Sequence, residues 1–219
     1  MDLKDAMQNR RSIRGYLPEP VDQATLKKVL QLATRAVSRT NSQPWQFAVV
    51  TGSLLDEIRK DNMDCFCQNM PGNEPSIPFT GIYQERRVGI AKQLLGAMDI
   101  RREDTERRNW WTQRGFRFFD APALIILYMD ASLDKAVFNF DMGCVTQNLC
   151  LAAMEYGLAT CVEEQAVHYE RGLRKYLGIH ADKRFVIGIS IGYADPEFPA
   201  NAVVTPREAV DKITKWYGF

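Results

Sequence analysis

The chain has 219 residues, and its 46% hydrophobic and 25% charged residues are the proportions of an ordinary folded protein. Its 28 Lys and Arg nearly balance its 27 Asp and Glu, which disfavours a protein whose main partner is nucleic acid. The apolar run at residues 121–129 is about half of the roughly 20 residues that span a bilayer, so we expect a cytoplasmic protein of one domain.

The first third of the chain is expected to place one strand among helices. Residues 3–10 are predicted to form a short helix, and Asp22 is a favourable N-cap for apolar residues that recur at helical spacing as far as Val37. The Val-rich residues 47–51 predict a strand. A helix is expected over 54–60 and, because of its Pro and Gly residues, a loop over 63–78.

The rest of the chain alternates less regularly between helices and strands. Residues 123–129 are apolar throughout, which predicts a strand buried on both faces. Residues 138–156 predict the longest helix, ended by Gly157 and apolar on nearly every face, as in a helix at the centre of a dimer. Further helices are predicted at 83–98, 169–177 and 207–216, and further strands at 159–162 and 184–193.

This order of elements predicts an α+β fold. Strands and helices intermix without a regular β-α alternation, and no G-x-G-x-x-G turn is present, which argues against a dinucleotide-binding doubly wound sheet. The five Cys are scattered and there are only two His, so the sequence predicts no disulfide framework and no metal site.

Three polar motifs could bind a ligand. Residues 10–14, Arg-Arg-Ser-Ile-Arg, form a plausible anion clamp, although a solvated helix end would look the same. Residues 38–43 are rich in short donors and acceptors and suit a planar polar ligand, unless they only begin the next strand. Arg207 opens a predicted helix, which is the unfavourable end for a cation unless an anion lies nearby; otherwise it is a surface residue.

Together with other short motifs, these residues resemble the nitroreductase family of flavin enzymes over nearly the whole chain. The motifs are R-R-S-x-R at 10–14, S-x-x-N-S-Q-P-W at 38–45, F-F-x-A-P at 118–122, D-x-G-x-x-x-Q-N-L at 141–149, G-L-A-T-C at 157–161 and G-Y-x-D-P at 192–196. The resemblance implies an intertwined α+β homodimer, a central mixed and mainly antiparallel sheet flanked by helices, and two FMN molecules at the subunit interface.

The resemblance also assigns roles to residues. Arg10 and Arg207 would hold the FMN phosphate, Ser12 the phosphate or ribityl chain, and Arg14 the pyrimidine end of the ring. Residues 38–41 would reach FMN from the partner subunit, and a backbone N–H within 162–165, that of Glu164 first, would point at flavin N5. The residues implied to bind the cofactor are Arg10, Arg11, Ser12, Arg14, Ser38, Arg39, Thr40, Asn41, Gln147, Glu163, Glu164, Gln165 and Arg207.

The implied activity transfers electrons from NADH or NADPH through flavin N5 to an electron-poor acceptor such as a nitroaromatic or a quinone. FMN supplies the redox chemistry, which explains why no catalytic side-chain pair stands out. Reductive dehalogenation, flavin fragmentation and non-catalytic flavin binding stay open as alternatives. A basic-patch binder is a further alternative, with the arginines Arg101, Arg102, Arg107 and Arg108.

Residues 63–119 match none of the shared motifs, so we expect them to form a variable insert that selects the acceptor. Trp110 and Trp111 lie among polar residues, which makes them candidates for a lid that stacks on a planar substrate. The alternative is that these aromatic side chains belong to the core.

Overall fold

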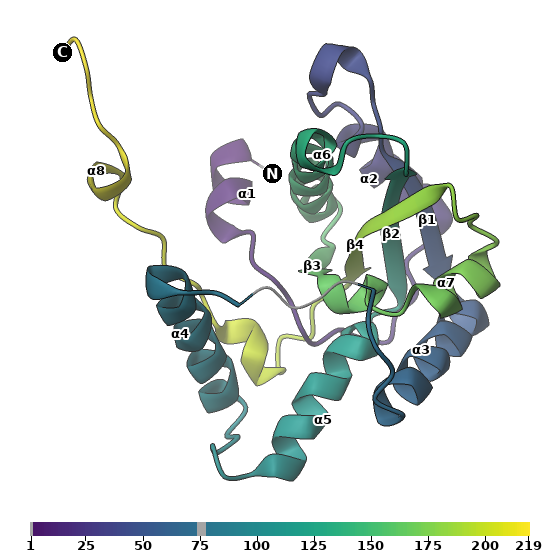
Figure 1. The fold of residues 1–219 in the computed structure, drawn as a ribbon. Coiled ribbons are helices and arrows are strands. Elements are labelled where there is room, and N and C mark those ends of the chain that lie inside the picture. Colours follow the sequence, from purple (N-terminus) through teal and green to yellow (C-terminus); the bar gives the residue numbers. More distant parts are fainter. Residues whose placement is uncertain (1, 74–77) are drawn as a thin grey trace.

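A computed structural model describes residues 2–73 and 78–219, whose strands form one sheet in the order β1-β2-β4-β3 (Figure 1). The strands are β1 (Gln46–Thr51), β2 (Ala123–Asp130), β3 (Ala159–Glu163) and β4 (Lys183–Gly192). Each neighbouring pair is antiparallel. The sheet was expected to be mixed, but all four of its strands pair antiparallel. Within the described residues the parallel pairing is a single bridge between Thr160 of β3 and Ser12, which lies outside the four strands.

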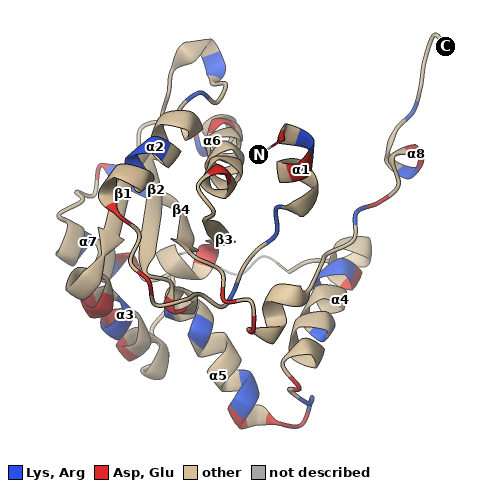
Figure 2. Ribbon diagram, turned by 180° about the vertical axis from the view of Figure 1, so that it is seen from behind, with Lys and Arg blue, Asp and Glu red and all other residues tan. Residues whose placement is uncertain are grey.

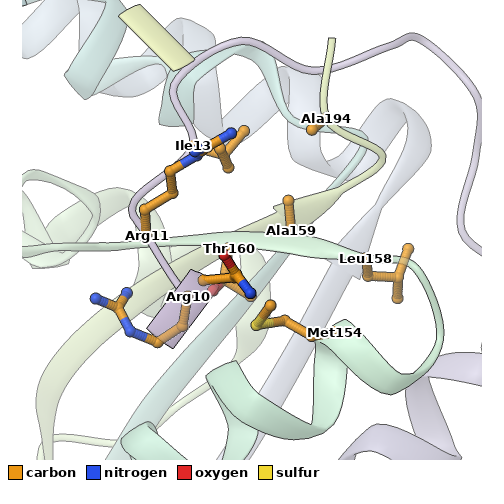
Figure 3. A pocket seen from close by; sticks show the side chains of 9 residues that line it. Arg10, Arg11, Ile13, Met154, Leu158, Ala159, Thr160 and Ala194 are labelled. Atoms are coloured by element: carbon orange, nitrogen blue, oxygen red, sulfur yellow. The ribbon is translucent and has the colours of Figure 1, made fainter. Parts of the chain in front are cut away.

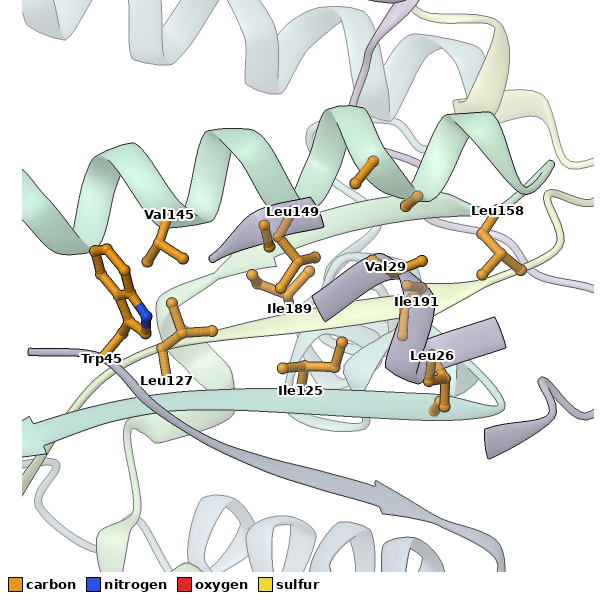
Figure 4. Packing of buried hydrophobic residues seen from close by; sticks show 14 of the residues in the cluster. Leu26, Val29, Trp45, Ile125, Leu127, Val145, Leu149, Leu158, Ile189 and Ile191 are labelled. Carbon is orange, nitrogen blue, oxygen red and sulfur yellow. The ribbon is translucent and has the colours of Figure 1, made fainter. Parts of the chain in front are cut away.

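Helices cover both faces of the sheet (Figure 1). The helices are α1 (Leu3–Asn9), α2 (Gln23–Ala33), α3 (Gly52–Cys67), α4 (Gly81–Ala97), α5 (Thr105–Phe116), α6 (Lys135–Glu155), α7 (Glu170–Leu177) and α8 (Val210–Ile213). On one face α2 and α6 bury Val29 and Leu149 against Leu127 and Ile189 of the sheet, as Figure 4 shows. On the other face α3, α7 and the turn at Phe118 cover the opposite side of β2.

The two-sided cover explains why β2 is apolar along its length, and it confirms that strand prediction. Helix ends follow their local signals as well. The Asp22 side chain accepts from the Thr25 N–H at 2.9 Å, which caps α2. Gly157 and Gly178, with φ of 69° and 65°, follow α6 and α7 in the left-handed conformation that stops a helix.

Several predicted bounds were wrong. The second helix ends at Ala33, so Val37, expected on its apolar face, is exposed. Residues 63–67, expected to be loop, continue α3, and residues 74–77 of that predicted loop lie outside the described residues. The helix expected over 207–216 is reduced to Val210–Ile213. Arg207 therefore precedes that helix and does not open it. The helix is short because the C-terminal segment buries no apolar face against the body of the chain.

The C-terminal segment leads away from the sheet, past α4, to α8 (Figure 1). It exposes most of its large apolar side chains, and α6, expected to be buried all round, leaves Phe140 71% exposed. Within one chain α6 is thus buried on one side only. No helix in the described part of the chain is long and apolar enough to cross a membrane.

Candidate functional site

The segment after α1 carries the first arginine motif along the outer edge of β3. The Ile13 N–H donates to the Thr160 carbonyl at 3.0 Å, which fixes the register of the segment on the strand. Its far end is fixed by Asn201, whose Oδ1 accepts from the Arg14 N–H at 2.7 Å and whose Nδ2 donates to the Gly15 carbonyl at 2.8 Å. Sequence reasoning gave Asn201 no role, because it lies 187 residues from Arg14 in the chain.

A pocket lies where this segment meets the end of α6 and the start of β3. Figure 3 shows the side chains of Arg10 and Arg11 beside those of Met154 and Thr160. Among the described residues neither guanidinium forms an ion pair with a carboxylate, so both are available to an anion from outside the chain. Figure 2 shows the basic residues on this segment next to the acidic and basic residues of α1. The pocket is lined by Asn9, Arg10, Arg11, Ile13, Met154, Leu158, Ala159, Thr160 and Ala194.

At its other end β3 turns into the 3₁₀ turn η3 (Glu164–Val167). Of the range 162–165 predicted to face N5, Glu164 and Gln165 lie in this turn, and residues 162 and 163 are the end of β3. Gly188 of β4 allows the close approach, since a Cβ there would collide with the Cβ of Ala166. The Gln165 side chain packs on Gly115 and donates to the Thr112 carbonyl of α5 at 3.4 Å. The turn is thereby held between the sheet and α5, while Glu164 points into solvent.

Three aromatic side chains gather next to Arg14, and we call Trp110, Trp111 and Phe119 the aromatic platform. The Trp111 and Phe119 ring centroids lie 6.2 Å apart, and those of Trp110 and Trp111 lie 6.4 Å apart. The Arg14 guanidinium carbon lies 5.9 Å from the Phe119 ring centroid. The predicted ring-binding Arg14 and the predicted lid residues Trp110 and Trp111 are thus brought together by way of Phe119. Trp110 is 36% exposed and Trp111 is half-buried, whereas Phe119 is buried.

Arg114 supports this platform by hydrogen bonds to the backbone that carries it. Its guanidinium donates to the Arg14 carbonyl at 2.9 Å, to the Phe119 carbonyl at 3.2 Å and to Asp120 at 3.0 Å. Burial lowers the pKa of Arg114, and the nearby Asp120 opposes that shift. Nothing in a strongly polar helix marked one arginine as buried, so sequence reasoning missed it.

The turn that Arg114 contacts, η2 (Phe118–Asp120), has an uncommon backbone conformation. Phe118, Phe119 and Asp120 have φ of 58°, 49° and 59°, in the left-handed region that residues other than Gly rarely adopt. Such a conformation persists only where the surroundings hold it. Here the holding groups are the Arg114 guanidinium and the Ser190 hydroxyl, which donates to the Phe118 carbonyl at 3.0 Å.

The polar loop at residues 38–43 is held against α6 by Asp141. This buried carboxylate accepts from the Arg39 N–H at 3.0 Å and from the Ser42 hydroxyl at 3.4 Å. The Ser38 hydroxyl accepts from the Gln43 N–H at 3.1 Å, so it closes its own loop. Thr40 and Asn41 are exposed at the loop tip.

Two predicted cofactor residues lie apart from this cluster within one chain. Arg207 donates to Thr205 and Pro206, its own neighbours in the C-terminal segment. Gln147 is exposed on α6. Of the basic patch, Arg107 donates to the Met98 and Asp99 carbonyls at 2.8 and 2.6 Å, so it closes the turn between α4 and α5. The described residues contain no group of His, Cys, Asp and Glu that could hold a metal ion.

Comparison with known proteins gives whole-chain matches. Residues 7–193 match the model of the nitroreductase family. Nitrobenzene nitroreductase from Ectopseudomonas oleovorans is 33% identical over 217 residues, covering 97% of this chain and 95% of that protein. The structure of the FMN and NADPH-dependent nitroreductase NfnB from sphigopyxis sp. strain HMH matches with a TM-score of 0.94 and 31% identity over 100% of both chains. The FMN-dependent nitroreductase NfnB from Mycobacterium smegmatis, in complex with NADPH, matches with a TM-score of 0.92 and 29% identity over 98% of this chain and 97% of that chain.

Proposed function

This chain belongs to the nitroreductase family, and from that membership we propose that it is an FMN-dependent enzyme that passes electrons from NAD(P)H to nitroaromatic compounds. The observation that carries the proposal is the match of the whole chain, at a TM-score of 0.94, to a nitroreductase described as dependent on FMN and NADPH. The solved relatives point to NADPH as one donor. Quinones remain a second class of acceptor, which the sequence resemblance implied.

The residues present fit FMN. Arg10 and Arg11 offer guanidiniums that no carboxylate of the described residues neutralises, as a phosphate site requires. Arg14 and the aromatic platform offer a cation beside flat aromatic surfaces, which suits a planar ring with an anionic reduced form. When bound, FMN supplies the redox chemistry between the nicotinamide and the nitro group.

The protein's own contribution is to bind and orient. The Arg10–Arg14 segment, pinned by Thr160 and Asn201, would hold the phosphate at one end and the ring at the other. The η3 turn, clamped by Gly188 and Gln165, would present backbone N–H groups at a fixed position, since neither β4 nor α5 leaves it room to shift.

The absorption spectrum of the purified protein tests the proposal. We expect the spectrum of oxidised flavin, anaerobic bleaching by NADPH or NADH, and its return when nitrobenzene is added. Protein that binds FMN and is not bleached would be a non-catalytic flavin-binding protein. If NADPH or NADH bleaches the flavin and nitrobenzene fails to reoxidise it, reductive dehalogenation and flavin fragmentation would be the remaining functions.

A homodimer with residues 38–41 serving the partner's FMN remains part of the proposal. Its support is the apolar surface that one chain leaves open on α1, α6 and the C-terminal segment. The exposed large apolar residues there are Leu3, Met7, Phe140, Val204, Val210, Ile213, Trp216, Tyr217 and Phe219. Large apolar side chains exposed together on a few elements are typical of a surface that a protein partner covers.

We therefore expect sedimentation at low micromolar concentration to give about 50 kDa, twice the 25.0 kDa of one chain. Changing Trp216 and Phe219 together to Ser should shift this mass toward the monomer and weaken FMN binding with it. Leu54→Ser, at an exposed apolar residue of α3, serves as the matched control and should sediment as the wild type does. A stable monomer loaded with FMN would contradict the shared site.

The prediction that the platform selects the acceptor is tested at Trp111. Trp111→Ala should raise the KM for a nitroaromatic by about 2–10-fold, the loss of one aromatic contact, and leave flavin reduction by NADPH nearly unchanged. Trp111→Phe should keep most of the wild-type KM, and Trp110→Ala tests the more exposed ring in the same way. Stopped-flow measurement of the two half-reactions checks this result. Equal losses in both half-reactions would mean that these rings only build the scaffold.

A further inference from the structure

Glu163, the last residue of β3, has a buried carboxyl that the proposed chemistry does not use. The residue is 6% exposed. Its Oε1 lies within hydrogen-bonding distance of the Ser190 hydroxyl on β4. Its Oε2 is buried and, among the described residues, has no hydrogen-bond partner. A buried carboxylate with one unmet oxygen is unfavourable, so the protonation state of Glu163 needs an explanation.

The hydrogens around Ser190 can be counted. Its hydroxyl carries one hydrogen and lies within reach of two oxygens, the Glu163 carboxyl and the Phe118 carbonyl at 3.0 Å. If Glu163 were ionised, it would take that hydrogen, and the Ser190 and Phe118 oxygens would face each other with none between them. A neutral carboxyl donates its own hydrogen to Ser190, which then donates to Phe118, so each of these two contacts holds a hydrogen and the unpaired Oε2 carries no charge.

The charges around Glu163 do not outweigh its burial. Arg14, from the segment beside β3, and Arg59, from α3, both lower its pKa. Neither guanidinium bonds to the carboxyl, since Arg14 donates to the Ser12 carbonyl and Arg59 to backbone carbonyls and Asp56. Burial is the largest influence and raises the pKa of Glu163 to about 8, against the opposing effects of Ser190 and the two arginines.

Two other buried titratable groups face the same carboxyl. Tyr16 donates to the Ser190 carbonyl at 3.3 Å, and burial first, with Glu163 and Cys161 adding, raises the pKa of its phenol. The pKa of Cys161 rises to about 12, through burial first and Glu163 second. Both groups are neutral at physiological pH, so neither supplies a charge that would favour an ionised Glu163.

We propose that Glu163 is a positioning residue that keeps its proton in the folded protein at neutral pH and, through Ser190, pins the strained η2 turn beneath the aromatic platform. Deprotonation takes the Ser190 hydrogen away from Phe118 and places a buried negative charge behind the end of β3. The effect on a bound flavin rests on the proposed function. The proton and the η2 contact do not.

Stability as a function of pH tests the proton. The unfolded chain releases the Glu163 proton near the ordinary glutamate pKa, about 4.3, whereas the folded chain keeps it to about 8. Between these values the folded state binds one more proton, so wild-type stability should fall as the pH rises. Glu163→Gln, which is uncharged and keeps a donor toward Ser190, should lose that one-proton slope. Denaturant unfolding of both proteins from about pH 5 to pH 9 measures it.

Glu57→Gln, at an exposed carboxyl of α3, is the matched control and should keep the wild-type slope. Parallel pH profiles for wild type and Glu163→Gln would overturn the proposal. Should Glu163→Gln fail to fold, infrared spectroscopy of the wild type decides. A protonated-carboxyl band present at neutral pH and lost on raising the pH past about 8 supports the proposal, and its absence at neutral pH refutes it.

FMN titration over the same pH range tests the positioning role. Wild-type affinity for FMN should fall by about tenfold as Glu163 ionises, which is about 1.4 kcal/mol, while Glu163→Gln stays within about twofold of its neutral-pH value. An equal fall in both proteins would refute the positioning role, and the protonation state of Glu163 would still be decided by the stability profile. Absence of FMN binding at every pH would contradict the proposed function instead, and the stability profile would still decide the state of Glu163.

Discussion

Replacing Arg10 by Ala is expected to weaken FMN binding by about 10–150-fold, the effect of losing roughly 1.5–3 kcal/mol of charge-assisted hydrogen bonding. Arg10 lines the pocket at the end of α6, and no carboxylate of the described residues competes for its guanidinium. A phosphate there would gain a bidentate partner at little desolvation cost, because the side chain is only half-buried.

Titration of the flavin-free protein with FMN, followed by flavin fluorescence, measures this change. Lys4→Ala is the matched control, because it removes one positive charge from exposed surface on α1 and should leave the dissociation constant near that of the wild type. Arg207→Ala should produce a loss of the same order as Arg10→Ala, although within one chain Arg207 bonds only to its own segment. An unchanged dissociation constant in both arginine variants would contradict the phosphate site.

Replacing Arg114 by Met is expected to lower the free energy of unfolding by about 2–5 kcal/mol, the second large effect. The Arg14 and Phe119 carbonyls would each lose a donor, and Asp120 would lose one of its two charged partners and keep only Arg117. Methionine fills a similar apolar volume, so the decrease in the free energy of unfolding measures lost hydrogen bonds more than lost packing.

Urea unfolding at one fixed protein concentration measures the effect of Arg114→Met, because a dimer's stability depends on concentration. Arg108→Met, an exposed position on the same helix, is the control and should change stability by less than about 0.5 kcal/mol. If both variants lost equally little, the carbonyls around Arg114 would have to find other donors, and its support of the platform would be refuted.

Much of the candidate site could be predicted from the sequence where short motifs carry it. The arginine motif at 10–14 and the loop at 38–43 were predicted as candidate ligand sites, and ligand binding at both stays a prediction. In the structure Arg10, Arg11 and Ile13 line a pocket, and the buried Asp141 holds the loop. Asn201 was given no role and Arg114 was missed, because Asn201 acts on a residue 187 positions away in the chain and Arg114 on one 100 positions away. No local pattern distinguishes a polar side chain that will be buried by a distant segment from one that stays in solvent.

The sequence by itself determined the local features of this protein. The N-cap of Asp22, the helix stops at Gly157 and Gly178 and the two-sided burial of residues 123–129 follow from hydrogen bonds and apolar spacing within a few residues. The tertiary structure alone decided the strand order β1-β2-β4-β3, the short α8 within 207–216 and the burial of the Glu163 carboxyl. Each of these depends on which distant groups exclude water from a residue, and exclusion of water is a property of the folded chain and not of any local stretch of it.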